Sequence, residues 1–192
     1  MNANVGMLCP VAAVCSYTAG NAPSYSSGKV IAEAVAASLA WNRADNHFYG
    51  DDMELDSDNG VRGYTISFEP TGLTDEARGL LLGETVQTGE YTVNEDAAPD
   101  VGFGYVRVMR LTGTSGVTNS YEGWWFYKVK FGVTNEETRT KEQNIEWRTP
   151  TLTGTGFGVQ KTNGGKIDYA VHKTFASKAD AVAYVKGKAG LT

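Results

Sequence analysis

The stretch that decides the fold is Tyr121-Glu122-Gly123-Trp124-Trp125-Phe126-Tyr127-Lys128-Val129-Lys130-Phe131. Its second half alternates apolar residues with Lys128 and Lys130, which is the period-two pattern of a β-strand. The consecutive aromatic residues at 124–127 place large side chains on both faces of that strand. We therefore expect burial on both faces, inside a β-sandwich or at a subunit interface. Alternatively, the aromatic cluster binds a sugar or a base by stacking.

Patterns on either side of this stretch predict further strands. Residues 64–68 alternate apolar with polar side chains, and residues 101–111 repeat apolar side chains on one parity. A connection rich in Gly, Ser and Thr at 112–119 joins residues 101–111 to the aromatic strand at 121–131, so these two strands are expected to form a hairpin. A further strand is expected around Ile145 and Trp147. The run 29–41 fits a strand or a helix, and periodicity leaves both open.

Two short helices interrupt the β pattern. The first is expected to begin after Thr74 as N-cap, with acidic residues in its first turn, and to stop at Gly83. The second is expected to begin at Ser177, with Asp180 as capping-box partner, and to end at Gly187. Its apolar side is narrow, so we expect a peripheral, docking helix.

The charges of the chain are unevenly distributed. The net charge is -5, which argues against a general nucleic-acid binder held by a basic surface. Residues 161–192 carry six Lys and two acidic residues, so the remainder of the chain is strongly acidic. No apolar run is long enough to span a membrane. A signal peptide begins with a positively charged segment, and no Lys or Arg precedes Lys29. The protein is expected to be cytosolic when made, with Cys9 and Cys15 as buried free thiols rather than partners that close a short loop.

The most conspicuous polar segment is acidic. Between residues 45 and 60 there is no Lys or Arg. A calcium loop starting at Glu54 would put Asn59 where glycine is needed and Thr65 where the last Glu is needed, so that register fails. The segment is interpreted as a solvated loop or as a docking surface for a basic partner face. Its acidic residues are Asp45, Asp51, Asp52, Glu54, Asp56 and Asp58.

The sequence contains no recognisable catalytic motif. His47 and His172 are the only histidines, and neither lies in a nucleophile or metal motif. The glycines spaced two apart, at 102–104 and 154–158, do not form a phosphate-binding turn, and in strands they allow close approach of neighbouring groups. We expect no enzyme activity, no cofactor and no metal.

The order of segments resembles that of the major tail tube proteins of long-tailed, non-contractile bacteriophages. The resemblance covers roughly residues 29–157. The pieces that match are, in chain order, Gly28-Lys29, Phe48-Tyr49-Gly50-Asp51-Asp52, Gly63-Tyr64-Thr65-Ile66-Ser67-Phe68, the helix at 73–83, Pro99-Asp100-Val101-Gly102-Phe103-Gly104-Tyr105, the aromatic strand at 124–131, Thr138-Arg139-Thr140-Lys141-Glu142 and Trp147-Arg148-Thr149-Pro150-Thr151-Leu152-Thr153-Gly154.

This resemblance implies a mainly β fold, an antiparallel β-sandwich or half-barrel of the tail-tube type, with one short flanking α-helix and a small C-terminal helix. It divides the chain into an N-terminal arm and first strand at 1–28, the tube domain at 29–158 and a basic C-terminal arm with a short helix at 159–192. In the family, six subunits form a ring, and a long loop reaches the neighbouring ring. The implied stacking-loop residues are Asp45, Tyr49, Asp51, Asp52, Glu54, Asp56 and Asp58. The arm residues expected to contact neighbours are Lys173, Lys178, Lys186 and Lys188.

The resemblance also implies partners and a location. The rings stack into a tube in the virion tail after assembly in the host cytoplasm, and tape-measure, tail-tip and tail-terminator proteins are the partners. Double-stranded DNA passes through the lumen without specific binding, and no membrane is involved. Two other functions stay open. One is a monomeric carbohydrate-binding β-sandwich module that uses Trp124 or Trp125, and the other is a tail terminator or head-tail joining protein on the same fold.

Overall fold

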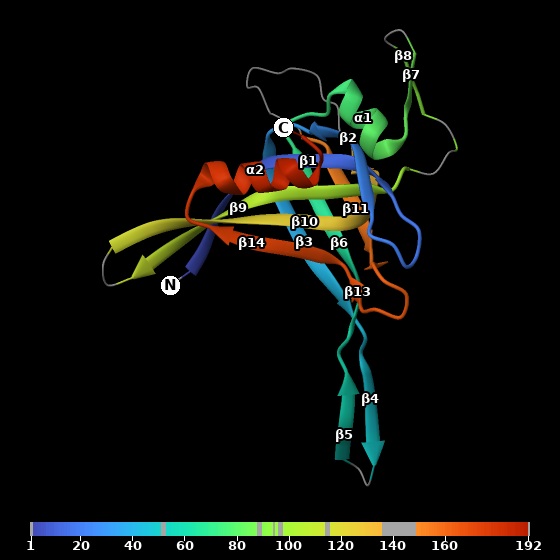
Figure 1. Cartoon of the computed structure of the whole chain (residues 1–192), viewed down its shortest axis with the longest axis vertical. Coiled ribbons are helices and arrows are strands. Elements are labelled where there is room, and N and C mark those ends of the chain that lie inside the picture. Colours follow the sequence, from blue (N-terminus) through green and yellow to red (C-terminus); the bar gives the residue numbers. More distant parts are fainter. Residues whose placement is uncertain are drawn as a thin grey trace.

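The computed structural model describes residues 2–50, 53–87, 90–93, 95, 98–113, 116–135 and 149–191. Figure 1 shows a β-sheet body with a helix on each of two sides and a long hairpin that projects from one end. The helices are α1 (Asp75–Leu82) and α2 (Lys178–Lys188). The strands are β1 (Asn2–Ser16), β2 (Ser24–Val30), β3 (Ala34–Arg43), β4 (Asn46–Gly50), β5 (Met53–Asp58), β6 (Val61–Pro70), β7 (Thr85–Gln87), β8 (Glu90–Thr92), β9 (Val101–Gly113), β10 (Gly116–Asn135), β11 (Thr151–Phe157), β12 (Val159–Gln160), β13 (Ile167–Asp168) and β14 (Ala170–Phe175).

The main sheet has eight strands in the order β2-β1-β9-β10-β11-β6-β3, and β14 pairs with β10 off this path. Every pairing in it is antiparallel. The long strand β10 pairs with β9 along one side, while its other side pairs first with β14 and then with β11. The mainly β, antiparallel fold expected from the sequence is confirmed, including the expected hairpin, which is formed by β9 and β10.

The sheet curls so that its two outer strands come together. Only residues 31–33 separate β2 from β3, which are the first and last strands of the order. The Ile31 amide donates to the Pro10 carbonyl at 2.9 Å, and the Thr71 amide donates to the Glu33 carbonyl at 2.8 Å. These bonds tie the linker to β1 and to the end of β6, which gives the half-barrel form. The run 29–41, left open by the sequence, is therefore mostly strand.

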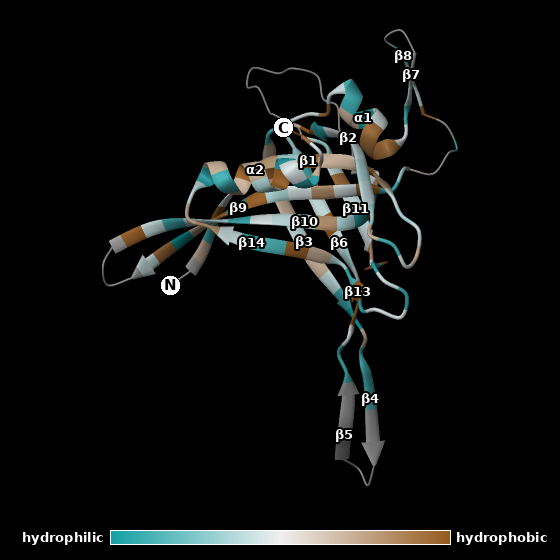
Figure 2. Cartoon of the chain, in the orientation of Figure 1, coloured by the Kyte–Doolittle hydropathy of each residue, from teal (hydrophilic) through white to brown (hydrophobic). Residues whose placement is uncertain are grey.

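The curled sheet separates two hydrophobic cores. One lies inside the curl, is closed by Ala77, Leu80 and Leu81 of α1, and contains most of the buried aromatic side chains of the described residues. The other lies between the opposite face of the sheet and α2. Figure 2 shows hydrophobic segments alternating with paler ones along the strands between the two helices. The expectation that the aromatic strand is buried on both faces is confirmed.

A β-bulge in β10 changes which residues share a face. The register with β9 shifts between Phe126 and Val129. Trp125 and Tyr127 face α2, whereas Phe126, Val129 and Phe131 face the core inside the curl. Tyr121, Trp125, Tyr127, Val129 and Phe131 share one parity in the sequence, but they do not share one face of the sheet, because the extra residue of a bulge inverts the alternation.

The first helix follows its sequence signals closely. The Thr74 hydroxyl accepts a hydrogen bond from the Ala77 amide at 3.3 Å, and Gly83 ends α1 with a left-handed φ of 75°. These are the N-cap and C-cap roles that Thr and Gly favour. Both predicted ends of α1 are confirmed.

The second helix departs from its prediction in two respects. Ser177 is the N-cap but makes no side-chain capping bond, so the expected capping box with Asp180 is not formed, and α2 ends at Lys188 rather than Gly187. Its buried residues are small, and they pack where the sheet has glycines. A Cβ at Gly104 would lie 2.9 Å from Val185, and one at Gly123 would lie 3.1 Å from the same side chain. Glycines therefore let α2 approach the sheet closely, as expected of strand glycines.

Both predicted arms are parts of the sheet body. Residues 1–28, predicted as an N-terminal arm and first strand, contain β1, which lies between β2 and β9, and Val11, Ala12 and Ala13 are fully buried. The expected arm at 159–192 supplies β14, which pairs with β10, and α2, which covers a core. The expected strand around residues 145–147 lies outside the described residues. No helix in the described ranges is long and apolar enough to span a membrane.

Candidate functional site

The acidic segment forms a hairpin that projects from the body. Strands β3 and β6 pair from Ala34 to Arg43, and beyond them the chain continues as β4 and β5. In the register of this hairpin Asn46 faces Asp58 and Tyr49 faces Glu54. Figure 1 shows β4 and β5 extending away from every other labelled strand. In the described part of the chain each pairs only with the other, so the segment is a hairpin rather than a loop.

Hydrogen bonds and one ion pair fix the base of the hairpin. The Asp58 carboxylate accepts from the Gly60 amide at 2.9 Å and lies 2.6 Å from the Arg62 guanidinium. The amide hydrogen bond, with help from Arg62, lowers the pKa of Asp58 below its ordinary value. The Arg43 guanidinium donates to the Asn59 carbonyl at 3.2 Å. These contacts hold the hairpin in line with β3 and β6.

The predicted stacking-loop residues divide into three groups. Asp58 fastens the base, and Asp45 lies 2.8 Å from the His47 imidazole, so both have local partners. Tyr49, Glu54 and Asp56 lie on the two projecting strands. Asp51 and Asp52 lie outside the described residues.

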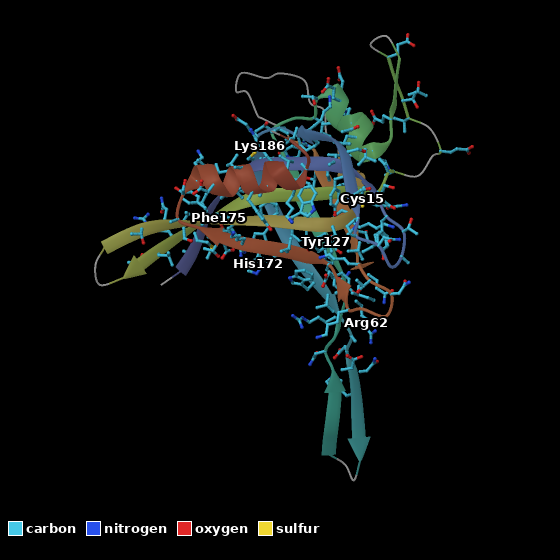
Figure 3. The ribbon with its side chains drawn as sticks, viewed as in Figure 1. Cys15, Arg62, Tyr127, His172, Phe175 and Lys186 are labelled. Atoms are coloured by element: carbon cyan, nitrogen blue, oxygen red, sulfur yellow. The ribbon has the colours of Figure 1, made fainter. Side chains whose placement is uncertain are left out.

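The predicted basic contact residues lie on β14 and α2. Lys173 is on β14, with its ammonium 5.3 Å from the centre of the Phe175 ring. Lys178, Lys186 and Lys188 are on α2, and Lys188 lies 5.5 Å from the Tyr184 ring. Figure 3 shows Lys186 on α2 and Arg62 at the hairpin base in well separated parts of the molecule. One chain therefore does not bring the acidic hairpin and these lysines together.

Strand β3 forms an edge of the main sheet, and most of this edge carries no charged residue. In the described residues β3 pairs with β6 alone, and β3 from Ala34 to Asn42 contains no charged residue and no proline. Val35 near its start is 56% exposed. Monomeric β proteins protect such edges with charges, prolines or short strands, because an exposed edge pairs readily with another chain.

The aromatic cluster makes extensive contacts within the chain. Trp125 is fully buried, with the Tyr25 ring packed edge-on at 4.9 Å. Trp124 is stacked on His172 with the ring centres 4.4 Å apart, and the Arg107 guanidinium lies 5.1 Å from its ring centre. Trp125 has no face to offer a sugar, and Trp124 already has stacking partners.

An ion pair beside Trp124 was missed by the sequence patterns. Glu122 accepts from the Trp124 indole at 3.1 Å and from Arg107 Nε at 3.0 Å. Partial burial acts to raise the pKa of Glu122, but these hydrogen bonds outweigh it, and the pKa lies below its ordinary value. Arg107 and Glu122 are direct cross-strand partners. The available signal was Arg107, which interrupts the apolar parity of its strand.

The cysteines are free thiols on one extended strand. Cys9 is half-buried and Cys15 is buried. Six residues of strand separate them by about 20 Å, whereas a disulfide needs Cα atoms within about 7 Å. Burial raises the pKa of Cys9, and burial followed by the Asp100 charge raises that of Cys15 to about 11. Among the described residues no three His, Cys, Asp or Glu side chains gather as metal ligands.

No protein-family model matches the chain, and no curated protein matches its sequence.

Proposed function

We propose that the chain is a structural subunit that assembles into stacked rings and forms the tail tube of a long-tailed, non-contractile bacteriophage. The observation that carries the proposal is the acidic hairpin β4–β5, which extends from the body as a continuation of β3 and β6. An ordered element that pairs only with itself in the described chain is suited to contact another copy. The tail-tube resemblance of the sequence assigns this role to the same segment.

The free edge of β3 supports lateral assembly. Backbone groups along an unprotected edge can pair with a strand of a second copy, and no charge on β3 before Arg43 opposes this. A contact between two different edges is heterologous, and it closes into a ring when the rotation between copies permits. The hairpin then provides the contact along the axis on which the rings stack.

The overall charge supports the transport of DNA. The chain carries a net charge of -5, so a ring of identical copies is acidic overall. Phosphates are held mainly by lysine and arginine, so an acidic or neutral channel lets double-stranded DNA slide without adhering. Tape-measure, tail-tip and tail-terminator proteins are the partners that such a tube requires.

Electron microscopy of the purified chain over a concentration series tests the proposal. Hollow tubes are expected, and single rings that never stack would instead favour a tail terminator or joining protein. Val35→Lys places a charge on the β3 edge and should abolish assembly without unfolding the subunit. Val93→Lys is the matched control, because Val93 is 79% exposed and lies outside every strand. Wild-type protein that stays monomeric at all concentrations, even with tail-tip and tape-measure proteins added, contradicts the proposal.

A further inference from the structure

A shallow hollow lies along α2. It has a volume of about 440 Å³ and is lined by Ala179, Val182, Ala183, Lys186 and Leu191. The residues that α2 buries against the sheet, Ala181 and Val185, lie on a different side of the helix. The floor of the hollow is made of small and aliphatic side chains, and Lys186 is its charged wall. We call this surface the α2 groove.

The charges around the α2 groove suit an acidic partner. Helix α2 carries Lys178, Lys186 and Lys188 against the single acid Asp180. The other helix is unsuitable, because α1 begins with Asp75 and Glu76 and has no basic residue in its last turn. Among the two helices, α2 is therefore the one that would attract an acidic element.

The hairpin β4–β5 is acidic and lies at the opposite end of the molecule. In Figure 1 it extends along the longest axis, away from the end that carries α1 and the C-terminus, with α2 close to that end. A second copy displaced along this axis would present its α2 end to the hairpin of the first. The acidic residues Glu54 and Asp56 lie on β5.

We propose that the α2 groove of one copy receives the acidic β4–β5 hairpin of a second copy. Lys186 pairs with the acidic residues of the hairpin. The contact is heterologous, so it repeats from copy to copy along one axis. This inference rests on the proposed function and specifies the acceptor surface for ring stacking.

Charge reversal and charge exchange test the contact in the full-length chain. Lys186→Glu, or the pair Glu54→Lys and Asp56→Lys, should raise the concentration at half-assembly by about tenfold or more, the factor that corresponds to roughly 1.4 kcal/mol. The three changes combined restore opposite charges and should recover assembly. Lys166→Glu is the matched control, because Lys166 is exposed and lies outside α2.

A steric variant tests the groove without changing charge. Ala183→Trp fills the hollow from an exposed position and should block tube growth, whereas Ala22→Trp, in the exposed β1–β2 connection, should not. Circular dichroism confirms that each variant is folded. Tubes from Lys186→Glu and Ala183→Trp like those of the wild type would overturn this inference but leave the proposed function standing. Impaired variants that the exchanged charges do not rescue would exclude the hairpin as occupant, and a wild type that never assembles contradicts both proposals.

Discussion

Gly104→Ala is expected to destabilise the subunit strongly, because Gly104 lies where the sheet and α2 meet. The new Cβ would lie 2.6 Å from Trp125 Cε3, 2.7 Å from the Trp124 carbonyl oxygen and 2.9 Å from Val185 Cγ1. Ordinary contacts of a Cβ begin at 3.4 Å, so all three neighbours are too close. One of them is backbone of the adjacent strand and another belongs to the helix.

The magnitude follows from how little these neighbours can move. Trp125 and Val185 are both fully buried, and Trp125 is also packed against the Tyr25 ring. Inserting one methyl group into such a core typically costs about 1–3 kcal/mol. With obstruction on three sides we expect a loss of about 3 kcal/mol in the free energy of unfolding, a large share of the roughly 5–15 kcal/mol that stabilises a typical domain.

Urea unfolding followed by tryptophan fluorescence, at a concentration where the chain is monomeric, measures this loss. Gly132→Ala is the matched control in β10, because Gly132 is exposed and no atom lies within 4 Å of its added Cβ. The control should be unchanged or more stable by up to about 1 kcal/mol, since alanine restricts the unfolded chain. A Gly104→Ala loss below about 0.5 kcal/mol, or an equal loss in the control, would refute the close-packing argument.

Three further predictions concern the cores and the buried polar groups. Leu81→Ala should lower the free energy of unfolding by about 2–5 kcal/mol in the same urea assay, because Leu81 is fully buried where α1 closes the curl. Arg107→Ala should cost about 1–3 kcal/mol at neutral pH, because the Glu122 carboxylate loses its ion pair and keeps only the hydrogen bond from Trp124. Because the pKa of Glu122 is lowered in the folded state, its contribution to the free energy of unfolding is present above about pH 4.5 and is lost as the pH falls through the folded-state pKa. On acid titration, the free energy of unfolding should therefore decrease less in Arg107→Ala than in the wild type. Cys15 should react with a disulfide reagent at pH 8 only after unfolding, because the thiol is buried. Since the pKa of Cys15 is raised to about 11 in the folded state, the free energy of unfolding should decrease between pH 9 and 11, and this decrease should be smaller in Cys15→Ala.

The features that sequence patterns predicted well are those fixed by nearby residues. The ends of α1 follow from Thr74 and Gly83, which act within one helical turn. The alternation of Tyr64, Ile66 and Phe68 gave a strand with these side chains buried, and all three are at most 1% exposed. The acidic segment was also found directly, because charge is a property of the residues themselves.

The features that patterns missed depend on contacts between distant segments. Whether residues 1–28 form an arm or a central strand depends on β9, which pairs with β1 from about one hundred residues away. Likewise, the narrow apolar side of α2, marked by Val182 and Val185, did not indicate that Ala181 would be fully buried, because the glycines against which α2 packs lie on β9 and β10.

The sequence by itself determined the β character, the ends of α1, the acid-rich segment and the lack of charge along β3, since each depends on residue type and local spacing. Tertiary structure decided the bulge in β10, the docking of α2 and the direction in which the hairpin projects. It also buried Trp125 and stacked Trp124 on His172. The physical reason is that a strand exposes two faces and two edges, and only pairing and packing with distant segments determine which of them remain open.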